Sequence, residues 1–232
     1  MLAQLRKVCG LVFLMSCSFV ELSAKGGAKK FLEQNYLEES KKSFLFNEVS
    51  DFMPRLKELA KECSTVVELG GDQRAGSVSI VLGLMENFRE EKKFYLYCPR
   101  GFQRQDKKFL RKFSLMPIEF VCDNREFLFQ TPFEVDLVYV NSWHTYPRLY
   151  SELCHFAPFT KKFIAILHTH SHWENEDEPD YSLLRYSPFK ELCKDKKGLR
   201  LAIEDFLNSH TEWEKFEDHA NSHGFTILKR VK

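Results

Sequence analysis

The chain has 232 residues, 44% apolar and 29% charged, which is ordinary for a globular protein with a substantial core. This length allows one large α/β domain or two small ones. Since 34 basic residues nearly balance 33 acidic ones, the net charge of +1 gives no overall field that would recruit nucleic acid or an anionic membrane surface.

The first 24 residues differ from the rest. Arg6 and Lys7 precede residues 8–20, an uncharged run that is short for a membrane span but suits the apolar region of a signal peptide. Cys17 also ends a stretch that resembles a bacterial lipoprotein cleavage box. We therefore expect residues 1–24 to be a signal-peptide-like or anchor segment, which implies export or membrane attachment. The alternative is a helical extension of a cytoplasmic protein.

A linker and an N-terminal helix are expected over residues 25–46, followed by one α/β domain over 47–232. Residues 48–61 have helical spacing, with Ser50 or Asp51 as the N-cap. Beyond them, strands are predicted at 64–69, 93–98, 118–122, 135–140, 162–167 and 225–231, and helices at 77–88, 105–113, 147–154 and 198–210. Apolar strands that alternate with helices predict an α/β fold, a mostly parallel, doubly wound sheet with helices on both faces.

The carboxyl ends of the parallel strands should form one ligand-binding edge, which we call the mouth. Topology alone brings these segments to it: residues 68–71, 98–101, Asp123, 141–146 and 168–172. The loop after the first strand carries a glycine pair in the spacing E-L-G-G-x-x-x-x-G, from Glu68 to Gly76. This is neither the dinucleotide fingerprint nor a P-loop. At the strand end, the Glu68 carboxylate could reach an amine or hydroxyl of a ligand.

Four segments together resemble one family. They are residues 66–70 (VVELG), 134–153 (EVDLVYVNSWHTYPRLYSEL), 161–168 (KKFIAILH) and 198–230, which ends in NSHGFTILKR. In this order they resemble a bacterial group of class I S-adenosylmethionine-dependent methyltransferases related to the cephalosporin hydroxylase family. The resemblance covers about residue 47 to the end of the chain, and it implies the Rossmann-like fold of that class.

The resemblance also implies roles for individual residues. S-adenosylmethionine would be bound by Glu68, Gly70, Gly71 and Asp123. His144 would face the acceptor substrate, where an imidazole can act as a general base towards a hydroxyl. A structural role for His144 is the alternative. Trp143 and Tyr146 would line the substrate side or serve as packing. The implied reaction is O-methylation of a small molecule or sugar.

Several positions depart from the family pattern. The family's second loop glycine falls at Arg74, unless Gly76 takes its role, and Cys98 stands where an aspartate meets the ribose. Asn141 and Thr169 replace the two carboxylates that hold a divalent metal in metal-dependent relatives. These changes favour a second hypothesis, an inactive methyltransferase-fold protein that binds a ligand or partner.

A third hypothesis rests on the segment HTHSH. His168, His170 and His172 alternate, so in an extended chain their imidazoles would project to one side, near His144. Imidazoles gathered in this way suit zinc, nickel or copper better than magnesium, and would support hydrolytic or oxidative chemistry. The acidic run that follows, residues 173–180, is expected to be a solvated, mobile loop.

Overall fold

The structure, a computed structural model, describes residues 27–41, 49–70, 74–89, 91–98, 118–121, 134–178 and 195–231. Its centre is a seven-stranded sheet in the order β3-β2-β1-β4-β5-β7-β6. The strands are β1 (Thr65–Leu69), β2 (Lys93–Tyr97), β3 (Ile118–Val121), β4 (Val135–Val140), β5 (Thr160–Leu167), β6 (Trp213–His219) and β7 (Phe225–Arg230). Strands β1 to β5 pair in parallel, whereas β7 runs antiparallel to both β5 and β6. The predicted fold class is confirmed.

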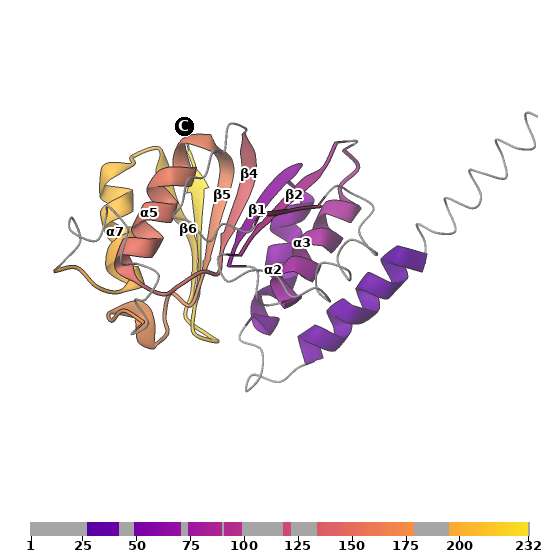
Figure 1. Cartoon of the computed structure of the whole chain (residues 1–232), viewed down its shortest axis with the longest axis horizontal. Coiled ribbons are helices and arrows are strands. Elements are labelled where there is room, and N and C mark those ends of the chain that lie inside the picture. The colour runs from indigo at the N-terminus through magenta and orange to yellow at the C-terminus, as the bar shows by residue number, and fades with distance from the viewer. Residues whose placement is uncertain are drawn as a thin grey trace, which may run out of the picture.

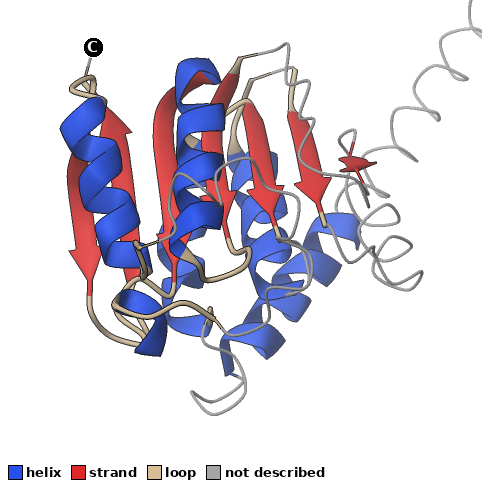
Figure 2. Ribbon diagram, turned by 60° about the vertical axis from the view of Figure 1, so that its left-hand side comes forward, coloured by secondary structure: helices blue, strands red, loops and turns tan. Residues whose placement is uncertain are grey.

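Helices cover both faces of this sheet (Figures 1 and 2). On one face lie the helix of residues 27–41, η1 (Ser50–Phe52), α2 (Met53–Lys61) and α3 (Arg74–Glu86). On the other lie α5 (Tyr146–Phe156), η2 (Ala157–Phe159) and α7 (Leu199–Ser209). Each layer shares an apolar core with the sheet, so the sheet is buried from both sides.

Strand β4 shows why the central strands are mostly apolar, although its Asp136 is polar and accepts hydrogen bonds from the Ser64 and Thr65 amides. All of its residues are buried. Leu137 and Tyr139 pack with α2 and α3, whereas Val138 and Val140 pack with α5 and α7. Successive side chains point to opposite faces and both faces are covered, so neither set of positions needs to be polar.

The predicted cap of the first helix is wrong. Helix η1 begins at Ser50 and leads directly into α2, and neither N-cap position makes a side-chain capping hydrogen bond. The Asp51 carboxylate instead accepts a hydrogen bond from the Ser222 hydroxyl, in the turn between β6 and β7. Asp51 therefore fastens η1, which leads into α2, to that turn.

Strand β6 was not predicted from the sequence. Its residues read WEKFEDH, and among them only Trp213 is buried. The strand lies at the edge of the sheet, beside β7. Charged side chains on an edge strand discourage pairing with other chains, and they also remove the apolar pattern from which a strand is predicted.

Helix 27–41 lies within the region where an N-terminal helix was expected, and Leu32 anchors it to the core with no exposed surface. The predicted signal-like segment 1–24 and the predicted helix 105–113 lie outside the described residues. Within the ranges that the structure describes, every helix is too short or too polar to cross a membrane.

Helices α2 and α3 pack so closely that Gly83 has no room for a side chain. A Cβ there would lie 2.2 Å from the backbone oxygen of Lys57 and 2.8 Å from Cβ of Ala60. We expect Gly83→Ala to lower the free energy of unfolding by about 1–3 kcal/mol, because the helices must separate. Urea unfolding measures this. The control is Gly27→Ala, where a Cβ meets nothing within 4 Å; equal effects of the two changes would contradict the prediction.

Candidate functional site

The strand order reverses between β1 and β4, which makes their carboxyl ends the switch point of the sheet. Gly70 leaves β1 with a φ of 107°, and a Cβ on it would lie 1.7 Å from the backbone oxygen of Asn141. The backbone amide of Asn141 in turn donates to the Leu69 carbonyl at 2.8 Å. Glycine is therefore required at position 70 by both backbone conformation and space.

Glu68 lies inside the protein at this point and has no exposed surface. One of its carboxylate oxygens accepts a hydrogen bond from the Ser77 hydroxyl at 2.8 Å. A Cβ on Gly76 would lie 2.7 Å from the Tyr139 ring, so α3 approaches the sheet closely here. Glu68 thus ties the end of β1 to the first turn of α3. Gly71 and Asp123, the other two residues expected at the cofactor, lie outside the described residues.

Asn141 presents an unusual polar group at the switch point. The residue is only 6% exposed, and its side-chain Nδ2 has no hydrogen-bond partner among the described residues. Buried side-chain donors without a partner are rare in native proteins, and each one calls for an explanation. The backbone of Asn141 lies against Gly70, at the point where the sheet is expected to meet a ligand.

The junction, residues 141–146, links β4 to α5 and is held by a buried ion pair. Arg148 Nε lies 2.7 Å from Glu152 Oε1, and the Ser142 hydroxyl donates to the other oxygen at 2.6 Å. Burial raises the pKa of Glu152, while Arg148 and the Ser142 hydroxyl oppose that rise. Thr145 caps α5 by accepting from the Arg148 amide at 3.3 Å. The junction therefore has a fixed path into the helix.

His144 is held within this junction by Glu178. Glu178 Oε2 lies 3.2 Å from both the backbone nitrogen and the ring Nδ1 of His144. The Glu178 amide donates back to the His144 carbonyl at 2.9 Å. The imidazole meets the His168 ring edge-on at 4.5 Å between centroids and lies parallel to the Trp173 ring at 6.4 Å.

His168 follows β5 directly and has a left-handed backbone, with φ of 64°. Its side chain is almost fully buried. Burial, together with the neighbouring His144 and His223, lowers the pKa of His168 to about 3. His168 is therefore neutral at physiological pH, so it adds no positive charge beside His144.

The expectation that the three alternating histidines project to one side is wrong, because the chain turns after Leu167 instead of staying extended. The His170 ring does not join those of His168 and His144. Its Nδ1 lies 3.2 Å from the Thr169 hydroxyl and its Nε2 3.6 Å from Asp218. His172 lies in η3 (His172–Glu174), against Trp173. Within the described part of the chain, no group of three or more His, Cys, Asp or Glu side chains could hold a metal ion.

The acidic run after β5, as far as it is described, is at least partly exposed at every residue, but several of its carboxylates are bonded to other elements. Asp177 Oδ1 accepts from the amides of Tyr146 and Gly198, both at 2.8 Å, and so joins the starts of α5 and α7. Glu178 holds His144, and Glu174 lies 3.2 Å from Arg200. Asp177 and Glu178 were not predicted as site residues from the sequence. The topology that places His168 at the mouth places the loop after β5 there as well. The position of this loop is the signal from which Asp177 and Glu178 could have been predicted.

The two aromatic residues of the junction have different surroundings. Tyr146 is buried, and its hydroxyl donates to Asp205 of α7 at 2.7 Å. The Lys196 ammonium lies 5.5 Å from the centre of its ring. Trp143 is half-buried, and its carbonyl accepts from the Thr145 amide at 3.0 Å. The structure thus uses Tyr146 to fasten α5 to α7, while Trp143 stays partly open to solvent.

The turn between β6 and β7 completes this side of the mouth. Gly224 has a φ of 93°, and a Cβ on it would lie 2.3 Å from the His170 nitrogen. The Thr226 hydroxyl lies 2.8 Å from the Thr169 hydroxyl and 2.7 Å from Asp218. Gly224 and Thr226, which contribute to the family resemblance, therefore pack against the loop after β5.

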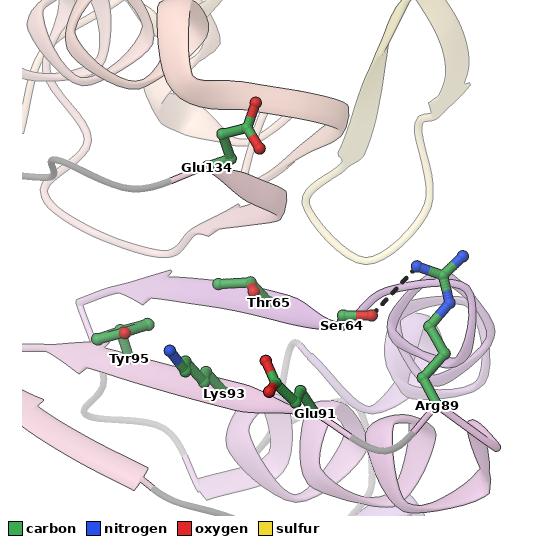
Figure 3. Close-up of a pocket in the computed structure, with 7 residues that line it drawn as sticks. All are labelled: Ser64, Thr65, Arg89, Glu91, Lys93, Tyr95 and Glu134. Carbon is green, nitrogen blue, oxygen red and sulfur yellow. Dashed lines mark hydrogen bonds between the residues drawn. The ribbon is translucent and has the colours of Figure 1, made fainter.

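A pocket of about 410 Å³ lies elsewhere, at the amino ends of β1, β2 and β4 (Figure 3). It is lined by Ser64, Thr65, Arg89, Glu91, Lys93, Tyr95 and Glu134. Arg89 donates to the Ser64 hydroxyl at 3.2 Å, and Glu134 forms an ion pair with Lys161. The pocket is lined by both acidic and basic side chains. It lies at the amino ends of the strands, whereas the mouth lies at their carboxyl ends. Ligands of open α/β sheets bind beyond the carboxyl ends of the strands, so the mouth is the candidate ligand site.

Burial of neutral His168 makes stability depend on pH. The folded-state pKa of about 3 lies below the ordinary value of about 6.5, so the unfolded chain binds the proton more readily. The stabilisation is complete above pH 6.5 and falls by up to about 1.4 kcal/mol per unit as the pH drops towards 3. We expect urea unfolding between pH 6.5 and 5 to show this slope. Asn tolerates a left-handed backbone, so His168→Asn should lower the slope, and an unchanged slope would refute the assignment.

No protein-family model and no curated protein sequence matches the chain. Solved structures do match its fold. The O-methyltransferase TomG from Streptomyces achromogenes, in complex with SAM, aligns with a TM-score of 0.52 at 10% identity, over 90% of each chain. An O-methyltransferase from Bacillus cereus in complex with SAH gives 0.50 at 8% identity, over 90% of this chain and 91% of that one. SAH-bound methyltransferase PaMTH1 from Podospora anserina gives 0.50 at 9% identity, over 90% and 88%. The chain has the Rossmann-like fold of the class I methyltransferases.

Proposed function

We propose that the protein is an S-adenosylmethionine-dependent methyltransferase that acts on a hydroxyl group of a small molecule or sugar. We place it in the bacterial group related to the cephalosporin hydroxylase family. The observation that carries the proposal is the buried side-chain amide of Asn141, whose Nδ2 has hydrogen to donate at the switch point and no partner among the described residues. A bound ligand with an acceptor atom at this point would supply that partner.

The residues at the mouth fit the methyl donor in part. Glu68 and Gly70 fix the end of β1, and Gly71 and Asp123 would complete the site. Cys98, which is buried at the end of β2, offers no carboxylate to a ribose. Loss of such a hydrogen bond costs about 1.5–3 kcal/mol, or roughly ten- to a hundredfold in affinity. Asn141 is one residue that could offset this loss.

When bound, S-adenosylmethionine supplies a methyl group on a positively charged sulfur. The chain has to hold the acceptor oxygen in line and remove its proton. We assign the role of accepting this proton to His144, because its ring is held in place by Glu178 and the neighbouring His168 is neutral. Trp143, half-buried in the same junction, would line the acceptor side.

A second candidate function is ligand binding without methyl transfer. It is favoured by Cys98 and by Thr169, whose hydroxyl is already bonded to Thr226 and which is almost fully buried. Such a protein would keep the fold and the Asn141 donor but not the chemistry. Binding of S-adenosylmethionine alone does not separate the two candidates; transfer of a labelled methyl group to an alcohol does.

We expect the full-length protein to bind S-adenosylhomocysteine saturably in calorimetric titration. Asn141→Leu removes the donor while keeping a similar volume, so it should weaken binding about tenfold. The same change should leave the melting temperature without ligand unchanged or raise it, because it removes a buried polar group that lacks a partner.

Asn35→Leu is the matched control. Asn35 lies in the helix 27–41, and its amide donates to the Phe31 carbonyl at 2.9 Å, so this change should leave the affinity as it is. Absence of binding at millimolar S-adenosylhomocysteine would exclude the proposed function. Equal affinities of wild type and Asn141→Leu would remove Asn141 from the site.

A further inference from the structure

We infer that Glu178 is a positioning residue for His144, which it holds as the tautomer with hydrogen on Nδ1, so that the lone pair lies on Nε2. The inference deepens the proposed function and rests on it only in assigning a proton transfer to His144. Glu178 comes from the loop after β5, a run that its composition marks as solvated surface.

The contact between the two residues is threefold. One carboxylate oxygen of Glu178 lies 3.2 Å from the His144 backbone nitrogen and 3.2 Å from its Nδ1. The Glu178 amide closes the pair by donating to the His144 carbonyl at 2.9 Å. The backbone bond fixes where Glu178 lies, and the carboxylate then fixes the direction of the ring.

The chemistry of the pair sets the tautomer. An ionised carboxylate can only accept hydrogen bonds, and a neutral imidazole has one N–H and one lone pair. The nitrogen that faces Glu178 must therefore carry the hydrogen, which leaves Nε2 as the acceptor. Both side chains are mostly buried, at 20% exposure for His144 and 28% for Glu178, so water only partly competes for this bond.

The surroundings of the ring make the carboxylate useful in proton transfer. The proton of an acceptor hydroxyl would pass to Nε2 while the electron pair of its O–H bond stays on oxygen. The imidazolium that results would lie beside the Glu178 carboxylate, with a charge-assisted hydrogen bond between them. On the other side lies His168, which is neutral and so does not repel the new charge.

Neighbouring residues of the loop allow a structural role to be separated from a positioning role. Asp177 ties the loop to α5 and α7 through the amides of Tyr146 and Gly198. Glu176 has the same charge as Glu178, but it is exposed and lies 3.7 Å from Lys197. Glu176→Gln is therefore a matched control for loss of one carboxylate from this loop.

The test is ¹⁵N NMR of histidine-labelled full-length protein at pH 8, with the His144 signals identified by their loss in His144→Asn. We expect the shift of a protonated nitrogen at Nδ1 and of an unprotonated one at Nε2. Glu178→Ala should lose this preference. Glu178→Gln keeps a carbonyl acceptor and should retain it, and Glu176→Gln should match the wild type.

A protonated Nε2 in the wild type, or an unchanged tautomer in Glu178→Ala, would overturn the inference. The backbone hydrogen bond from Glu178 to His144 does not depend on either side chain, so we expect the substituted proteins to fold. The dispersion of the amide signals in the NMR spectrum of each variant checks this. S-adenosylhomocysteine is titrated into the same samples. Absent binding with the expected tautomer would count against the proposed function alone, whereas normal binding with the wrong tautomer would count against Glu178 alone.

Discussion

The backbone contact between Gly70 and Asn141 is the constraint on which the mouth depends. Strands β1 and β4 are neighbours, and their chains leave the sheet at the same point, so a single Cβ on residue 70 would displace the start of the junction. Ser142 and His144 follow Asn141 within three residues, so the contact that positions Asn141 also constrains where they lie. Glu68 supports it from within the core through its bond to Ser77.

Two groups of carboxylates, from different elements, then hold the junction. Glu152, with Arg148 and Ser142, holds it against the body of α5. Asp177 and Glu178 hold it from the loop after β5. Burying charged groups costs free energy that their mutual attraction only partly returns, so such networks are weak evidence of stability. Here their effect is geometric, since they hold the junction and the His144 ring in place.

A tryptophan, a histidine and a tyrosine occur together where β4 meets α5 for different reasons. Tyr146 is part of the packing between α5 and α7, with its hydroxyl on Asp205. His144 is the residue that other side chains hold in place, and neutral His168 is part of its surroundings. Trp143 remains partly open to solvent. The chemistry proposed for the junction thus concentrates on one imidazole.

The sequence by itself predicted six of the seven described strands and the edge of the sheet at which the parallel strands end. Apolar runs such as 135–140 predict buried parallel strands, and the ends of parallel strands must meet, so the order of elements along the chain is enough to place His144 near His168. Only the tertiary structure decided how they meet. The left-handed turn at His168 separates it from His170, β6 is an edge strand without an apolar pattern, and Glu178 reaches His144 across 34 residues. The periodicity of apolar residues indicates which face of a helix or strand is buried. The turn at His168, the edge strand β6 and the contact of Glu178 depend instead on interactions between distant segments, which a local sequence pattern does not show.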